Sequence, residues 1–183
     1  MKRRSFVNAA LLAPVALPAL TPTPAPLRPV DGFVVRAGES RTGVHTPYRG
    51  VNPNDVKVSG KDTDGALAVF EYTGTQPIGP PLHTHAGQDE LFYILEGEYL
   101  FQVGDQQFTA RPGDTVFGPR GVPHSWLQQS ERGKIVYSVQ PAGKLEAFFL
   151  RMSQQQGPLS EADAQRIHRE HDMTIVGPPI TAR

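Results

Sequence analysis

The most informative segment runs from Gly79 to Gly97 and reads GPPLHTHAGQDELFYILEG. Successive side chains of a β-strand point to opposite faces, so His83 and His85 project the same way and can converge on one metal ion. The residues between His85 and Glu90 allow a turn, after which Glu90 opens the next strand and can add a carboxylate oxygen. The stretch therefore predicts three metal ligands on two neighbouring strands.

A second block, from Gly113 to His124, reads GDTVFGPRGVPH and places another histidine at the start of a later strand. A lone histidine of this kind is more often a surface residue or a hydrogen-bonded core residue. A cluster of histidine and glutamate between apolar strands is different, because unpaired buried charge is costly and a cation relieves it. We therefore predict that His124 joins the first three residues around one ion.

Short apolar stretches separated by turn residues surround these two blocks. A two-residue hairpin suits Gly104-Asp105, and a type II turn suits Pro112-Gly113. Strands at this spacing, with no helix between them, predict an all-β antiparallel sandwich or barrel. The predicted strands are Ala66–Tyr72, Leu91–Leu95, Tyr99–Val103, Gln106–Ala110, Thr115–Phe117, Ser125–Gln128 and Ile135–Val139.

The hydrophobic period changes near the end of the chain. Apolar residues recur at helical spacing from Leu145 to Met152, which predicts an amphipathic helix over about 142–154. Ser160 starts a second short helix that reaches about His171. We expect both helices to cover an edge or the bottom of the barrel, with His168 and His171 in contact with its surface rather than with a metal.

The first residues have the order of a secretory signal. Positive residues at 2–4 precede an apolar run at 9–20 and a Thr/Pro-rich stretch, and Arg3-Arg4 resembles a twin-arginine signal. Export to the periplasm or beyond is therefore expected; the alternative is a disordered or helical N-terminal tail on a cytoplasmic protein. The apolar run is short and broken by Pro14 and Pro18, which predicts no stable membrane anchor. The predicted organisation is a signal segment and Pro-rich linker at 1–29, a β-barrel at 30–142, and C-terminal helices and tail at 143–183.

Composition excludes several classes of function. The 183 residues include 18 Lys+Arg, 18 Asp+Glu and no Cys. Because the charges balance, there is no basic field for nucleic acid, and we expect no nucleic-acid partner. The lack of cysteine excludes disulfides, thiolate metal sites and a cysteine nucleophile.

The two blocks resemble the paired motifs of the cupin superfamily, small jelly-roll barrels that hold a metal with three histidines and one glutamate. The ligand positions fit both motifs, whereas Gly79 lies two positions too close to His83, and Gln128 stands where the second motif has asparagine. The resemblance covers about residues 60–142 and implies that the barrel predicted at 30–142 is an antiparallel jelly roll. Similarity to single-domain, quercetin-dioxygenase-like cupins implies that the metal binds substrate oxygens. It also implies that Glu90 serves as both ligand and catalytic base.

The types of ligand restrict the choice of metal ion, and the alternation of side chains along the strands indicates which residues line the pocket. With no thiolate, the site suits a divalent Fe, Mn, Ni or Zn ion. Parity places Phe92 and Ile94 on the face of Glu90, and Trp126 and Gln128 on the face of His124. These four side chains are the predicted substrate pocket, which would favour a flat apolar or phenolic compound. The alternative for each is an ordinary place in the barrel core.

The leading hypothesis is a metal-dependent dioxygenase or related oxidoreductase that acts on a small aromatic or phenolic compound. One alternative is a non-catalytic protein that binds a small molecule, and another is a sugar isomerase or epimerase. The apolar residues Leu91, Tyr93 and Leu95 have outward parity and would need cover, so we also expect a homodimer.

Overall fold

The computed structural model describes residues 31–181, so the predicted signal segment and linker at 1–29 lie outside the described residues. The described part folds into strands, two α-helices and a short 3-10 helix, η1 (Gly60–Thr63). The strands are β1 (Asn54–Val58), β2 (Ala68–Gly74), β3 (Pro81–His85), β4 (Asp89–Glu96), β5 (Tyr99–Val103), β6 (Gln106–Ala110), β7 (Thr115–Gly118), β8 (His124–Gln128), β9 (Gly133–Gln140) and β10 (Met173–Pro179). The helices are α1 (Leu145–Ser153) and α2 (Glu161–Glu170).

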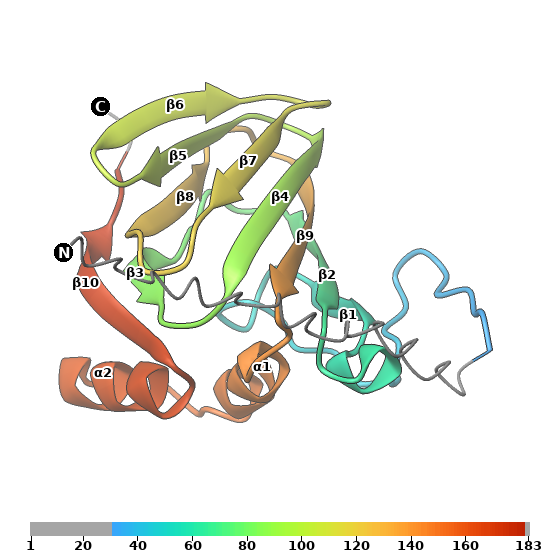
Figure 1. Ribbon diagram of the computed structural model, residues 1–183. Coiled ribbons are helices and arrows are strands. Elements are labelled where there is room, and N and C mark those ends of the chain that lie inside the picture. The colour runs from blue at the N-terminus through green and yellow to red at the C-terminus, as the bar shows by residue number, and fades with distance from the viewer. Residues whose placement is uncertain (1–30, 182–183) are drawn as a thin grey trace, which may run out of the picture.

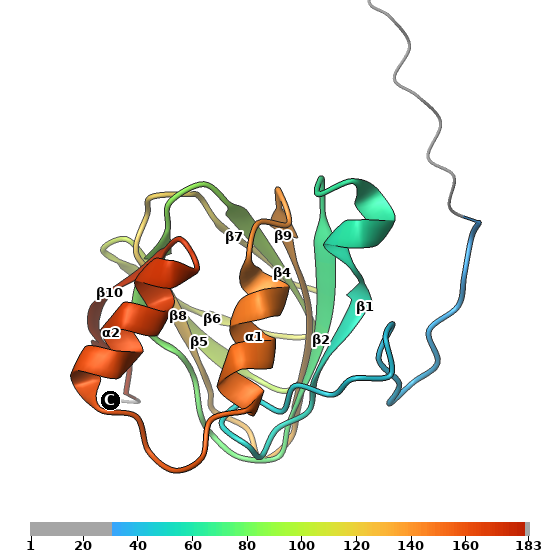
Figure 2. The same cartoon turned by 90° about the horizontal axis from the view of Figure 1, so that it is seen from below.

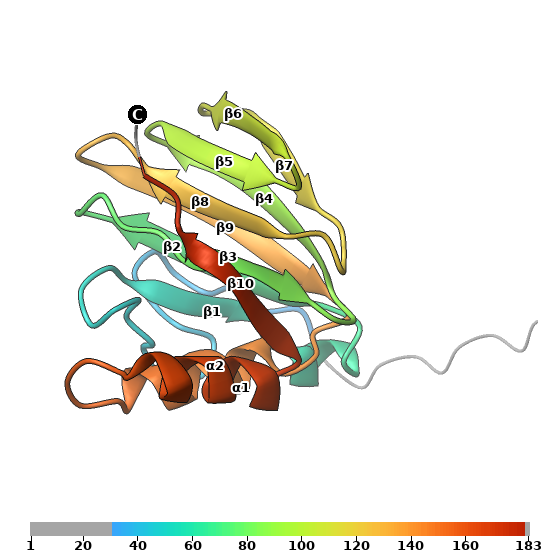
Figure 3. The same cartoon turned by 90° about the vertical axis from the view of Figure 1, so that its left-hand side faces the viewer.

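The strands form two five-stranded antiparallel sheets, in the orders β1-β2-β9-β4-β7 and β10-β3-β8-β5-β6. The two sheets face each other, as Figures 1 and 3 show. Neighbours such as β2 and β9 or β3 and β8 are distant in sequence, whereas β1 and β2, and β5 and β6, follow each other along the chain. This arrangement confirms the predicted jelly-roll barrel with two short C-terminal helices.

The core lies between the sheets and follows from strict alternation along the strands. In β2 and β9 every second residue is buried, as expected for strands with one face on a core. Aromatic side chains fill much of this space and pack edge-on or stacked, with Phe70 and Tyr137 5.0 Å apart between ring centroids. The completely or almost completely buried apolar residues are Ala68, Phe70, Tyr72, Ile94, Tyr99, Phe101, Ile135, Val139 and Ile167.

The turns behave as their residues predict. The β5–β6 hairpin closes through Gly104-Asp105 with Val103 paired to Gln106, and Gly104 has a φ of 57°. Gly113 has a φ of 96°, in the left-handed region that a type II turn requires at this position. Ser160 caps α2 by accepting a hydrogen bond from the Asp163 amide. The turn and cap residues identified in the sequence therefore fix the register of the β5–β6 hairpin and the start of α2.

Strand β10 is not predicted from the sequence, which indicated only a tail after α2. It pairs with β3, setting Met173 opposite His85 and Ile175 opposite His83. The sequence signal for β10 as a strand is weak because it contains Gly177 and two prolines. The pairing register with β3 shifts at these positions. As an edge strand it tolerates proline. The last described segment therefore lies directly beside the strand that carries two predicted ligands.

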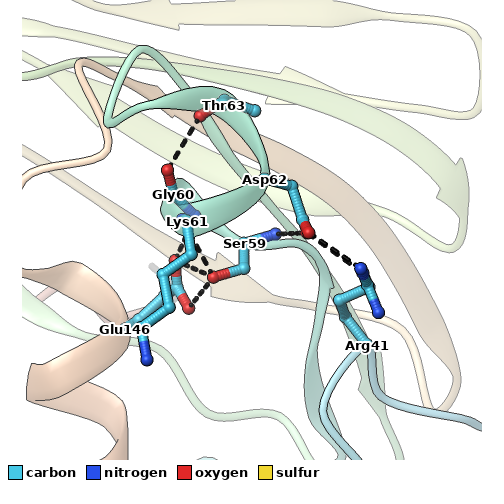
Figure 4. A network of polar contacts seen from close by, with 7 residues as sticks. All are labelled: Arg41, Ser59, Gly60, Lys61, Asp62, Thr63 and Glu146. Atoms are coloured by element: carbon cyan, nitrogen blue, oxygen red, sulfur yellow. Dashed lines mark hydrogen bonds and ion pairs between the residues drawn. The ribbon is translucent and has the colours of Figure 1, made fainter. Parts of the chain in front are cut away.

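Helices α1 and α2 lie side by side beneath the barrel, as Figure 2 shows. Helix α1 packs Phe149 against Phe70 with ring centroids 5.5 Å apart, and α2 buries Ile167 completely. A polar network fixes the first turn of α1 to η1 (Figure 4). Glu146 accepts hydrogen bonds from the Ser59 hydroxyl at 2.9 Å and from the Gly60 amide at 2.5 Å. The expected cover at the bottom of the barrel is thus present and anchored.

The outward face of β4 carries the exposed side chains Leu91, Tyr93 and Leu95, and Phe117 of β7 lies beside them. Their exposure agrees with the predicted strand parity, and the homodimer stays a prediction. No helix within residues 31–181 has the length and apolar character needed to cross a bilayer.

Candidate metal centre

Two sheets bring the four predicted ligands together. His83 and His85 lie on β3, and His124 at the start of β8 pairs with His83. Glu90 enters from β4 of the opposite sheet. One ligand atom from each residue lies within 4.8 Å of the others, and all four side chains are buried. The group can therefore hold a single metal ion.

Backbone carbonyls orient two of the three imidazoles. Nδ1 of His83 lies 2.9 Å from the Pro81 carbonyl oxygen, and Nδ1 of His124 lies 3.0 Å from the Val122 carbonyl oxygen. A carbonyl only accepts hydrogen bonds, so both Nδ1 atoms carry the proton. Each ring then presents its Nε2 atom to the centre, as a metal-ligating histidine does when its other nitrogen donates to a protein acceptor.

Gln88 orients the third imidazole, that of His85. This role of Gln88 was not predicted from the sequence. Its Nε2 donates to the carbonyl oxygens of Ala142, at 2.7 Å, and Pro141. Its Oε1 is therefore left to accept from Nδ1 of His85 at 3.1 Å. Gln88 is 3 % exposed, so this amide is a fixed part of the site. No family pattern named it, because it lies in the variable turn between His85 and Glu90.

The electrostatics of the cluster suit a cation. Burial alone would raise the pKa of Glu90, but hydrogen bonds with His124 and His85 lower it well below its usual value. Its Oε2 lies 3.0 Å from Nε2 of His124 and 3.3 Å from Nε2 of His85. Burial, followed by the neighbouring charges of His124 and His85, lowers the pKa of His83 to about 3. At neutral pH, Glu90 is therefore ionised and His83 is neutral, the forms that bind metal.

We expect Gln88→Leu to lower metal affinity by about 10- to 100-fold, the range typical for loss of an outer hydrogen-bond partner. Leucine fills similar space but cannot accept the proton on Nδ1 of His85, so the ring loses its fixed orientation. Competition between the protein and a coloured chelator measures the change. Gln88→Glu, which keeps an acceptor oxygen, is the matched control and should retain more affinity than Gln88→Leu. Equal affinity of Gln88→Leu and the unmodified protein would contradict this role.

A cavity of about 1080 Å³ opens from the metal centre towards the helices. Three of the ligands, His83, His85 and Glu90, line it. One wall is aromatic: Trp126 meets Tyr72 edge-on at 4.8 Å between centroids and lies 6.1 Å from Tyr48. The helices and β10 also line the cavity, through Phe148, Phe149, Met152, Ala164, His168, Met173 and Ile175. The cavity is thus mostly apolar, with the ligand cluster at one end.

The predicted pocket set needs correction. Trp126 lines the cavity, but Phe92, Ile94 and Gln128 do not. Phe92 and Ile94 are buried in the core, the alternative that parity left open. Gln128 is completely buried and donates a hydrogen bond to the Ser130 carbonyl oxygen at 2.8 Å, so it ties the end of β8 to the following turn. The alternation along a strand identifies the side chains that point into the barrel. Only those in its lower part border the cavity.

The remaining walls come from segments with no recognisable site motif. Tyr48 belongs to the stretch before β1, and Phe148 and His168 come from the helices that we expected to serve only as cover. The amphipathic pattern of α1 predicts an apolar face, but it does not say that part of this face borders a cavity. Asp89 points away from the site, as its parity predicts, and pairs with Arg120 at 2.6 Å.

Comparison with known proteins agrees with this geometry. Residues 72–139 match the family model described as a cupin domain. The chain is 33% identical over 89 residues to the quercetin 2,3-dioxygenase of Bacillus subtilis, a match that covers 49% of this chain and 26% of that protein. It is 38% identical over 50 residues to an uncharacterized protein of Methanocaldococcus jannaschii, covering 26% of this chain and 40% of the relative. The chain therefore spans well under half the length of either relative.

The fold is similar to that of solved cupins. An RmlC-like cupin from Shewanella frigidimarina superposes with a TM-score of 0.51 at 16% identity, covering 63% of this chain and 96% of that chain. At this identity the likeness concerns the fold alone. Together with the family match over β2 to β9 and the convergent His/Glu cluster, it identifies the chain as one that contains a cupin domain.

Proposed function

We propose that this protein is a metal-dependent dioxygenase or related oxidoreductase that acts on a small aromatic or phenolic compound. One observation carries the proposal: a buried cluster of three histidines and one glutamate lies at the end of a cavity with an aromatic wall. The match to a quercetin 2,3-dioxygenase, which covers 49% of this chain, supports the same class of reaction. Trp126 and the apolar side chains of the helices offer a flat ring more contact area than they offer a sugar.

His83, His85, Glu90 and His124 would hold the ion, and their nitrogen and oxygen donors suit divalent Fe, Mn, Ni or Zn. When bound, such an ion supplies open positions that draw substrate oxygens to the centre and polarise them. The chain itself contributes orientation and exclusion of water. Trp126 and Phe148 can hold a flat ring, and side chains of both helices line the cavity.

Glu90 is the group that can move a proton next to the substrate. Its Oε2 lies 3.0 Å from Nε2 of His124 and 3.3 Å from Nε2 of His85, so the carboxylate faces the centre where a substrate would bind. With an ion held by the cluster, a substrate hydroxyl at the centre could deliver its proton to a carboxylate oxygen of Glu90. We therefore assign Glu90 the role of base as well as ligand.

Oxygen uptake tests the proposal. Protein loaded separately with Fe, Mn, Ni or Zn is mixed with a panel of catechols and flavonols while dissolved oxygen is recorded. Uptake with at least one redox-active metal, and none with His83→Ala, is the expected result. Tight binding of panel compounds without uptake at any metal would instead favour a non-catalytic binding protein. Elemental analysis of protein from its native host, compared with His83→Ala, identifies the metal.

A further inference from the structure

The cavity contains a histidine that is not part of the metal cluster. His168, on the last turn of α2, lines the same cavity as His83, His85 and Glu90 but reaches it from the helical side. It is 7 % exposed, and its ring meets Phe148 of α1 edge-on at 4.8 Å between centroids. The ring is thus held between the two helices that cover the barrel.

The proton on this imidazole is located by its one hydrogen bond within residues 31–181. Nδ1 of His168 lies 2.7 Å from the carbonyl oxygen of Ala164, which can only accept. Nδ1 therefore carries the proton. Burial, opposed by this hydrogen bond and helped by the charges of His85 and His171, lowers the pKa of His168. At neutral pH the ring is neutral, and its Nε2 atom is a lone-pair acceptor with no partner among the described residues.

We propose that Nε2 of His168 accepts a hydrogen bond from a hydroxyl group of the compound that occupies the cavity. The cavity then selects hydroxylated aromatic compounds over their O-methylated forms. This inference rests on the proposed function and narrows its substrate class. An acceptor that loses its water when the cavity is filled disfavours an occupant that cannot donate, because the lost hydrogen bond to water is not replaced. With the metal cluster at the barrel end, His168 gives a flat compound a second polar anchor and so a fixed orientation.

Binding of a matched pair of probes tests this role. The probes are 2-naphthol and 2-methoxynaphthalene, which differ only in the donor hydrogen and a methyl group, and their fluorescence reports binding. The full chain is loaded with Zn, which is redox-inactive, so no oxygen chemistry interferes. We expect the unmodified protein to bind 2-naphthol roughly tenfold more tightly than 2-methoxynaphthalene. His168→Phe, which keeps a ring but removes the acceptor, should bring this ratio close to one.

Two further variants separate recognition from structure. His168→Gln retains an acceptor oxygen at a similar reach and should keep a preference of several-fold. His171→Phe changes a neighbouring histidine that also contacts Phe148 but does not line the cavity, so it should leave the ratio unchanged. A ratio that His168→Phe leaves unchanged would overturn the proposal, because the hydroxyl would then bind elsewhere, such as at the metal.

Imidazole ¹⁵N spectra of the unmodified protein give a second measurement that needs no variant to fold. The Nε2 resonance of His168 should shift when 2-naphthol is added and stay in place with 2-methoxynaphthalene. An unshifted resonance at saturating 2-naphthol would overturn the proposal. A failure of the proposed function looks different, since missing oxygen uptake with Fe, Mn or Ni leaves both the binding ratio and the ¹⁵N shift intact.

Discussion

His124→Ala is expected to abolish stoichiometric metal binding. Loss of an outer partner alone costs about 10- to 100-fold in affinity, and loss of a direct ligand removes more. The effect also appears in stability, because an ion that binds only the folded chain stabilises it by about 2.7 kcal/mol at a concentration of 100 Kd. For a domain of this size, that corresponds to a rise in Tm of roughly 5–10 °C. Calorimetric melting with and without added metal measures the rise, which the variant should lack.

The matched control for this variant is His45→Ala, which removes an exposed histidine of the segment before β1. It should keep the full metal-dependent rise in Tm. If His124→Ala kept this rise, or if the unmodified protein showed none with Fe, Mn, Ni or Zn, the ion would not lie among the four predicted residues. Elemental analysis of the same samples separates weak binding from binding at another place.

The ligands could be predicted from the sequence because they depend on local geometry. The alternation of strand side chains puts His83 and His85 on one face whatever the rest of the chain does. The Gly104-Asp105 hairpin then fixes the return of the chain towards His124. The strands between the motifs were predicted for the same reason, since their alternation and turn residues act over only a few positions.

The cavity could not be predicted in this way, because its walls come from contacts between distant segments. Trp126 and Ile94 both have inward parity, yet only Trp126 borders the cavity, and this depends on where α1 and α2 lie. The position of α1 depends in turn on Glu146 reaching Ser59, a contact across 87 residues. His168 shows the same limit, since helical spacing predicts its contact with the barrel but not its place in the cavity wall.

Gly79→Ala is expected to lower the stability of the fold more than any other substitution named above. Gly79 does not have a positive φ, so alanine could adopt its backbone conformation. The space is missing instead: a Cβ atom would overlap the Trp126 carbonyl oxygen and lie 2.8 Å from its carbon and 3.3 Å from Cα of Leu127. Backbone atoms cannot give way as a side chain can. We expect a loss of about 4 kcal/mol or more in the free energy of unfolding, measured by urea denaturation.

The same substitution should impair the metal centre, because the chain before β3 can make room only by moving away from β8. These strands meet through the pair of His83 and His124, so their ligand atoms would separate. Gly87→Ala is the matched control: it lies closer to the ligands, in the β3–β4 turn, but its Cβ atom would meet nothing within 4 Å. It should change stability and metal affinity little. Gly79 departs from the spacing of the cupin motif, and close approach to β8 gives a physical reason for glycine at this position. Normal stability and metal affinity of Gly79→Ala would refute that reason.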